Sequence, residues 1–156
     1  MGQRFAEPGL EFLFEAEIQL EPPQQLGATP LGGRAVYIVT SGTFAGPRLN
    51  GTVLPGGGDW FLQRADGIGE LDVRATLRTG DDALILMTYH GVLDAAPDVV
   101  TRVFAGEEVD PAEYHFRTAP RFETGDERYA WLNGRVAIAS GRFAPNSVAY
   151  RAYLVT

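Results

Sequence analysis

The sequence predicts an all-β fold, either a sandwich or a closed barrel, and three observations support it. In several segments apolar and polar residues alternate with a period of two, as they do along half-buried strands. The 19 glycines and 10 prolines provide turns at short intervals. No long segment shows the 3.6-residue period of an amphipathic helix. The length of 156 residues suits one domain that spans residues 1–156.

The two clearest predicted strands are residues 10–20 and 70–79, in which polar residues occupy most alternate positions. Residues 34–40 are apolar on both faces and predict a central strand. Residues 27–33 are interpreted as a turn-rich loop. Further strands are predicted up to residue 53 and at residues 60–64, 83–91, 113–123, 129–140 and 147–156, which makes about nine in all.

The connection formed by residues 92–111 loses the period-two alternation. Residues 98–105 within it predict a short helix, and the rest is interpreted as loop. The connection is long for a compact domain, and long connections of this kind often act as lids or binding segments.

The composition excludes several classes of function. The formal net charge of −7 argues against a nucleic-acid groove and against binding to an anionic membrane. All 13 basic residues are arginine, which excludes a Walker A lysine and lysine-based Schiff-base or pyridoxal chemistry. With two histidines and no cysteine, we expect no metal and no cofactor. Residues 1–17 lack the apolar run of a signal peptide, so we expect a cytoplasmic protein without a membrane segment.

The glycine-rich stretch of residues 46–67 is the first candidate for a binding site. Three glycines precede Asp59 and Trp60, and glycine lets other groups approach the backbone closely. In one interpretation Asp59 is a carboxylate at a pocket mouth and Trp60 is an aromatic wall. In the other, Asp59 bonds N–H groups of its own turn and Trp60 packs in the core. Asp66, in the hairpin signal that follows, is a further ligand-binding candidate.

Arg74 lies on the polar face of residues 70–79, together with Asp72. If that face lines a lumen, the guanidinium must be paired, because a lone buried charge is too costly. Its planar donor fork would then suit a carboxylate or phenolate ligand. If the face lies outside, the same row of side chains is simply solvated. The period alone does not decide between the two.

His115, Arg117 and Glu123 occupy alternate positions of the strand predicted at residues 113–123. Arg117 and Glu123 are interpreted as a structural ion pair or, alternatively, as a catalytic pair. His115 is a candidate general base because its ordinary pKa suits that task, although a surface histidine is the commoner case.

Tyr129, Trp131 and Asn133 share one face of the strand predicted at residues 129–140. Two aromatic rings and an amide would form a suitable wall for a small ligand. The alternative is an aromatic stripe in the core.

A set of short motifs runs in order along nearly the whole chain: Gly32-x-Arg34, Gly46-Pro47, Leu54-Pro-Gly-Gly-Gly-Asp59-Trp60, Arg64-x-Asp66-Gly67, Leu71-Asp-Val-Arg74, Phe116-Arg-Thr-x-Pro120, Phe122-Glu-Thr124 and Tyr129-x-Trp-Leu-Asn133. Together they resemble the bacterial and fungal family known as domain of unknown function 3237, or the UPF0311 proteins. The resemblance implies a single antiparallel, calycin-like β-barrel with an internal cavity, and it implies no established reaction. Asp81-Asp82-Ala83 departs from the family, in which glycine usually follows this acidic turn.

We therefore expect a barrel that binds a small apolar or aromatic molecule. As an enzyme it would perform cofactor-free acid–base chemistry, such as isomerisation, cyclisation, hydration or elimination. Asp59 would carry the proton, and Arg74 or Arg117 would stabilise negative charge. Trp60 and Trp131 would form the walls, so that aromatic acids would quench tryptophan fluorescence. The alternatives are a non-catalytic carrier and a structural subunit of a homo-oligomer with a filled barrel. Asp66, Glu123 and Asn133 complete the set of candidate site residues.

Overall fold

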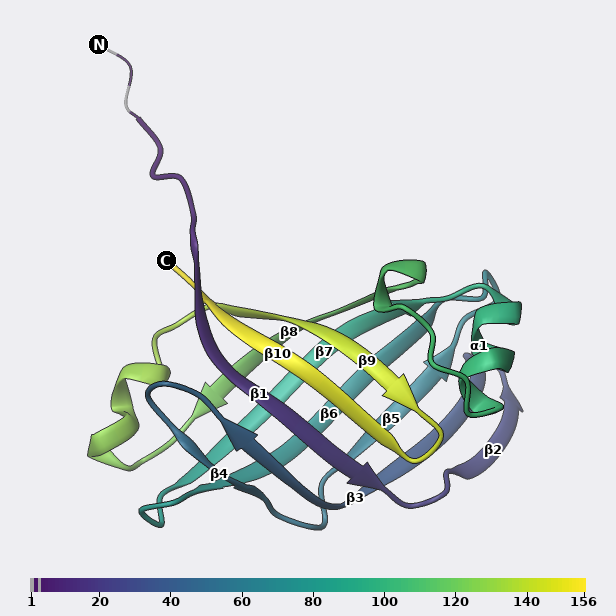
Figure 1. The fold of residues 1–156 in the computed structure, drawn as a ribbon, viewed down its shortest axis with the longest axis horizontal. Coiled ribbons are helices and arrows are strands. Elements are labelled where there is room, and N and C mark those ends of the chain that lie inside the picture. Colours follow the sequence, from purple (N-terminus) through teal and green to yellow (C-terminus); the bar gives the residue numbers. More distant parts are fainter. Residues whose placement is uncertain (1, 3) are drawn as a thin grey trace.

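The computed structural model, which describes residue 2 and residues 4–156, is a closed antiparallel β-barrel with eight strand positions (Figure 1). Its elements in chain order are β1 (Leu10–Leu20), β2 (Gln24–Thr29), β3 (Gly32–Ala45), β4 (Asn50–Val53), β5 (Gly58–Gln63), β6 (Gly69–Thr79), β7 (Leu84–Asp94), α1 (Pro97–Phe104), the short 3-10 helix η1 (Pro111–Glu113), β8 (His115–Glu123), a second 3-10 helix η2 (Glu127–Leu132), β9 (Ala137–Ala144) and β10 (Ser147–Val155).

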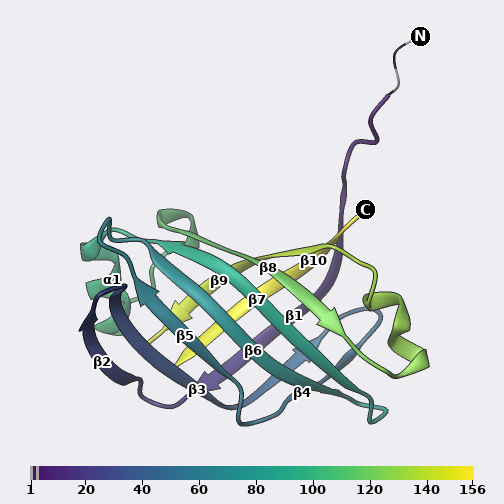
Figure 2. The same ribbon diagram turned by 180° about the vertical axis from the view of Figure 1, so that it is seen from behind.

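β1 closes the barrel, because it pairs with β10 on one side and with the second half of β3 on the other. From β10 the ring continues through β9, β8, β7 and β6. β4 and β5 share the remaining position between β6 and β3. β5 pairs with the first half of β3, and β4 pairs with its last residues (Figure 2). All of these pairings are antiparallel.

The apolar face of β6 points into the barrel. Leu71, Val73, Ala75 and Leu77 are buried, whereas Arg74 and Arg78 are exposed on the outer surface. A closed barrel removes its inner face from water, so a row of unpaired charges there would cost more than the burial of aliphatic side chains gains. Closure of the sheet thus decides which face of the strand is inside.

One end of the barrel is filled by side chains. The fully buried Phe14 ring has its centroid 5.4 Å from that of Phe44, 5.9 Å from Phe122 and 6.3 Å from Tyr150. Leu77 and the other fully buried side chains of this end pack in the same core, which also contains Ile85, Met87 and Leu132. We call this the closed end.

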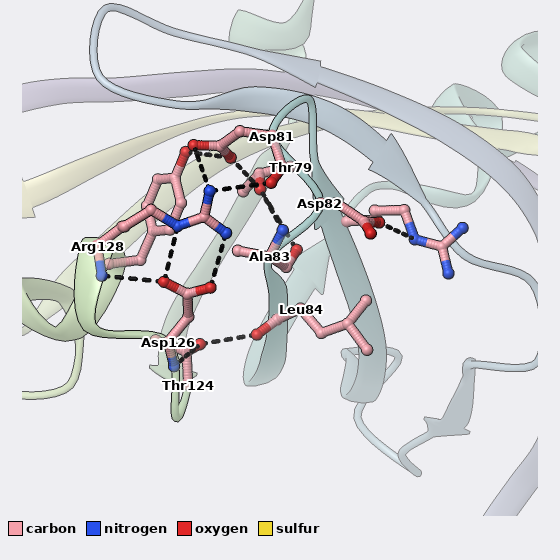
Figure 3. Close-up of polar contacts among 10 residues, drawn as sticks. Thr79, Asp81, Asp82, Ala83, Leu84, Thr124, Asp126 and Arg128 are labelled. Atoms are coloured by element: carbon pink, nitrogen blue, oxygen red, sulfur yellow. Dashed lines mark hydrogen bonds and ion pairs between the residues drawn. The ribbon is translucent and has the colours of Figure 1, made fainter.

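A polar network fastens η2 across the closed end (Figure 3). Arg128 donates to both carboxylate oxygens of Asp126, at 3.0 and 2.8 Å, and lies 3.2 Å from the carboxylate of Asp81. The Tyr129 hydroxyl donates to Asp81 at 2.8 Å, and so does Thr79 at 2.6 Å. The network therefore ties the turn between β6 and β7 to η2.

The opposite end carries α1 and β2 (Figure 1). α1 begins at Pro97, whose missing N–H costs nothing in the first helical turn, and it buries Val99 and Val103. The helix predicted at residues 98–105 differs from α1 by one residue at each end. None of the helices in the described residues is both long enough and apolar enough to cross a membrane.

Two predicted segments differ from the structure. The loop predicted at residues 27–33 is partly strand, because β2 extends to Thr29 as an exposed edge strand beside β3. The strand predicted at residues 129–140 was wrong in its first half, where η2 lies instead. Asp126 caps η2 by accepting a hydrogen bond from the Arg128 N–H, and this local bond favours a helical turn over an extended strand.

Candidate functional site

A cavity of about 300 Å³ occupies the end of the barrel next to α1. On one side its polar side chains come from neighbouring elements, namely Gln25 of β2, Tyr37 of β3, and Asp59 and Gln63 of β5, and Tyr89 of β7 and Ser147 of β10 line it as well. The aromatic side chains Phe116 and Phe143 come from β8 and β9, which lie across the ring from β3 and β5, and Phe61 of β5 lines the cavity as well. Phe104 of α1 and the turn between β9 and β10 border the mouth. The volume is at the small end of the range for ligand pockets.

Asp59 faces the interior because of its position in the barrel register. It is paired with Tyr37 on β3 and with Val73 on β6, and Val73 is paired in turn with Tyr89 on β7. Directly paired residues of antiparallel strands point to the same face. The four side chains therefore form one inward-facing level, and all four line the cavity.

The Asp59 carboxylate sits in a gap of the ladder between β5 and β6. The two strands pair at Asp59 and Val73 and next at Leu62 and Glu70, so the residues between have no ladder partners across this seam. Oδ1 of Asp59 accepts a hydrogen bond from the Asp72 backbone N–H at 3.0 Å. Among the described residues this is the one hydrogen bond of the carboxylate, which leaves Oδ2 available to a ligand.

The glycines before Asp59 allow β5 to approach its neighbours closely. A Cβ atom on Gly58 would lie 2.6 Å from the carbonyl oxygen of Tyr37, and one on Gly57 would lie 2.3 Å from that of Arg74. Both distances are too short for a side chain, so the glycine run of the sequence places Asp59 between β3 and β6.

Burial raises the pKa of Asp59 from its ordinary value of 3.8 to about 7. The hydrogen bond from the Asp72 N–H lowers this pKa, the negative charge of Asp72 raises it, and the positive charge of Arg34 lowers it. Burial and the charge of Asp59 also raise the pKa of Tyr37, and burial raises that of Tyr89. Near neutral pH the cavity thus holds a carboxyl group that can give or take a proton, beside phenols that stay protonated.

Of the site residues predicted from the sequence, Asp59 lines this cavity and Trp60 does not. Trp60 points to the outer face and is 41% exposed, and Arg34 donates to its backbone carbonyl at 2.8 Å. Successive side chains of a strand point to opposite faces, so Asp59 and Trp60 cannot share one cavity. Phe61, two residues after Asp59, takes the place predicted for Trp60.

The predicted arginines lie outside the cavity. Arg74 is exposed on the outer face of β6, and Arg117 is exposed on the outer face of β8, where it donates to the carbonyl of Phe116 at 3.0 Å. Glu123 and His115 are exposed on the same strand face as Arg117. The structure thus corrects the placement of Arg74 and Arg117 beside the reacting group, because the alternation that buries Phe116 and Phe122 turns these charged side chains outward.

The remaining predicted residues occupy turns and the closed end. Asp66 accepts a hydrogen bond from the Ile68 N–H and pairs with Arg64 in an exposed turn. Trp131 lies on η2, and the Arg48 guanidinium stacks 3.6 Å from its ring centroid. The Asn133 amide accepts from the N–H of Thr124 at 2.8 Å and donates to its carbonyl at 2.9 Å. These contacts hold loops together, and none of these side chains lines the cavity.

Tyr37, Phe61 and Tyr89 line the cavity, although none of them was among the candidate residues predicted from the sequence. Their signal was present, because Asp59, Phe61 and Gln63 alternate along β5, and Tyr37 belongs to a strand with two apolar faces. Tyr37 and Tyr89 are each separated from Asp59 by more than twenty positions in the chain, and only the pairing of the strands brings them to its level. A period-two pattern carries no information on that register.

The position of Arg74 gives a direct prediction. Because its guanidinium is exposed on the outer wall, Arg74→Met should change the free energy of unfolding by no more than about 0.5 kcal/mol. It should also leave the affinity for a cavity ligand unchanged. A denaturant midpoint and a ligand titration, each beside the wild type, check this. A loss of ligand affinity in Arg74→Met would indicate that Arg74 takes part in ligand binding.

The fold and the site define a class of protein: a closed antiparallel β-barrel with an internal cavity that contains a carboxyl group. Within that class the chain belongs to the family described as "Protein of unknown function (DUF3237)", whose model matches residues 8–155. This confirms the resemblance seen in the sequence motifs.

Relatives and solved structures agree with the assignment. The chain is 33% identical to a UPF0311 protein of Clostridium acetobutylicum over 96% of both chains. It is 31% identical to the hydroalkoxylation enzyme phnH of Penicillium herquei, covering 88% of this chain and 76% of that protein. A crystal structure described as a beta-barrel like protein of Acinetobacter baumannii superposes with a TM-score of 0.87 at 32% identity, over 99% of this chain and all of the other.

Proposed function

We propose that the protein is a cofactor-free acid–base enzyme that acts on a small apolar or aromatic substrate. It adds the O–H bond of a substrate hydroxyl group across a carbon–carbon double bond, or catalyses the reverse elimination. The observation that carries the proposal is Asp59, the one carboxyl group among the described residues that line the cavity, with Oδ2 open to a ligand and a pKa of about 7. A relative named as a hydroalkoxylation enzyme, at 31% identity, supports this reaction class.

The proposed step balances without a further reactant. Protonated Asp59 donates its proton to one carbon of the double bond. The substrate hydroxyl oxygen forms a bond to the other carbon, and the hydroxyl proton passes to the Asp59 carboxylate. The enzyme returns to its starting state, and the product is an ether that is isomeric with the substrate. A carboxyl group that titrates near neutral pH is suited to both halves of this proton exchange.

The surroundings of Asp59 support the role. The aromatic walls exclude water from a cationic or polarised intermediate, and their faces carry negative potential. The hydrogen bond from the Asp72 N–H fixes the orientation of the carboxyl group, so that its other oxygen is held toward the substrate.

The test is turnover of neutral alkenyl phenols in which ring closure forms an ether. Asp59→Asn should lower kcat by about a hundredfold or more, because the amide keeps the shape but carries no exchangeable acid. Asp94→Asn is the matched control: it makes the same chemical change on an exposed residue of β7 and should keep wild-type activity. In heavy water the product should carry one deuterium, delivered to a single face of the double bond.

The pH profile gives a second readout. The reaction begins with proton donation, so kcat/KM should fall about tenfold per pH unit above pH 7. Turnover that is equal in Asp59→Asn and wild type would assign the chemistry to another group. Binding without any turnover, unchanged in Asp59→Asn, would favour the non-catalytic carrier.

A further inference from the structure

The charge of the cavity lining is one-sided. Among the described residues that line it, Asp59 is the one carboxylic acid and none is Lys, Arg or His. The arginines nearest to this part of the sheet, Arg34 and Arg74, lie on strand positions that point outward. The formal net charge of −7 adds a repulsive field for anions outside.

Several uncharged polar side chains of the lining lie beside Asp59, whereas Tyr89 and Ser147 come from β7 and β10. Gln25, Tyr37 and Gln63 flank Asp59 along β2, β3 and β5. Opposite them, Phe116 and Phe143 of β8 and β9 present aromatic surface. A molecule that fits therefore meets uncharged polar groups beside Asp59 and aromatic surface across the ring, with Phe61 of β5 adding aromatic surface on the side of Asp59.

We propose that the cavity selects uncharged aromatic molecules of one or two rings that carry a hydroxyl group, and that it rejects their carboxylate and phosphate counterparts. An anion placed there would lose its hydration without gaining a cationic partner, and it would face the Asp59 carboxyl group. A hydroxyl group can donate to Oδ2 of Asp59 and accept from the Tyr37 phenol. The volume of about 300 Å³ limits the number of rings. This inference refines the substrate class and rests on the proposed function for its biological meaning.

The selectivity reverses one expectation from the sequence. The sequence led us to expect that aromatic acids quench Trp60 and Trp131 as the walls of the cavity, with Arg74 or Arg117 available to stabilise negative charge. Both arginines lie outside, and both indoles lie away from the cavity. Aromatic acids are therefore the class that the cavity should bind least.

The experiment compares naphthylmethanol, naphthoate and naphthylmethylammonium of the same ring isomer by isothermal titration calorimetry. Naphthylmethanol should bind most tightly, and naphthoate at least about tenfold more weakly. Amide chemical-shift changes on naphthylmethanol binding should lie on β3, β5 and β6 near Asp59. Tighter binding of naphthoate, or tightest binding of the ammonium ion, would overturn the proposal. Failure of all three probes to bind would overturn it as well.

A matched pair of variants tests the electrostatic cause. Gln25 lines the cavity mouth, whereas its neighbour Gln24 does not, and both are exposed, so each should tolerate arginine. Gln25→Arg should improve naphthoate binding relative to naphthylmethanol by about fivefold, and Gln24→Arg should leave the ratio near the wild-type value. Equal ratios in both variants would contradict a charge-based selection.

The outcomes separate this inference from the proposed function. Selective binding of naphthylmethanol without turnover of any alkenyl phenol would support the proposed ligand class and contradict the proposed reaction. Turnover of anionic substrates that depends on Asp59 would support the proposed reaction and contradict the proposed ligand class.

Discussion

Asp59→Asn should make the protein more stable than wild type at pH 8 and equally stable near pH 4. The carboxyl group has a pKa of about 7 in the folded protein and an ordinary value of 3.8 when the chain is unfolded. Between these values the folded state binds the proton and the unfolded state does not, so the free energy of unfolding falls as pH rises from about 4 to 7. At about 1.4 kcal/mol for each pKa unit, the loss reaches up to about 4 kcal/mol.

The amide variant removes this titration and keeps an oxygen that can accept from the Asp72 N–H. Urea denaturation of both proteins from pH 4 to 8 gives the difference, in which the contributions of the other carboxyl groups cancel. Asp94→Asn, on the exposed end of β7, should show no such divergence. A difference that does not vary with pH would mean that Asp59 titrates normally and that the cavity does not desolvate it.

Phe14→Ala should lower the free energy of unfolding by about 3–5 kcal/mol. The Phe14 ring is fully buried at the closed end. Its neighbours Phe44, Phe122 and Tyr150 belong to β3, β8 and β10, each of which is held in place by its strand pairing in the barrel. They cannot collapse into the space that the ring leaves. For a protein of this size, thermal unfolding should shift downward by about 10 °C.

Phe61→Ala is the matched comparison, because the same atoms are removed from a ring that faces the cavity. It should cost at least about 2 kcal/mol less than Phe14→Ala, because fewer packing contacts are lost beside an open space. Its effect should appear instead in the binding of naphthylmethanol, which Phe14→Ala should leave unchanged. Equal stability losses for the two variants would indicate a barrel that is filled from end to end.

Much of the fold could be predicted from the sequence where strands are half-buried. The strand predicted at residues 10–20 has the bounds of β1, and that predicted at residues 70–79 differs from β6 by one residue. In both, the alternation follows from a dry inner face and a wet outer face. The prediction failed at residues 129–133, where aromatic residues at alternate positions mimic a strand but local capping by Asp126 produces η2.

Of the candidate site, the sequence could indicate Asp59, which lines the cavity. The glycine run beside it marks a close approach of strands, which is a local property. The choice of Arg74 and Trp60 required knowledge of which strand face is inside, and that is decided by closure of the whole sheet. The rule that adjacent strand residues face opposite ways would have separated Trp60 from Asp59 without a structure.

The mouth of the cavity is assembled from three separate chain segments: β2, α1 and the turn between β9 and β10. At the closed end, the aromatic contacts of Phe14 and the ion pairs of Arg128 involve residues of other segments. Segments such as those of the mouth can be exchanged between related proteins while the strands that carry them stay the same. Transplanting α1 and the β9–β10 turn from one family member to another should therefore transfer ligand preference with little change in folding, which makes this barrel a suitable scaffold for grafting new specificities.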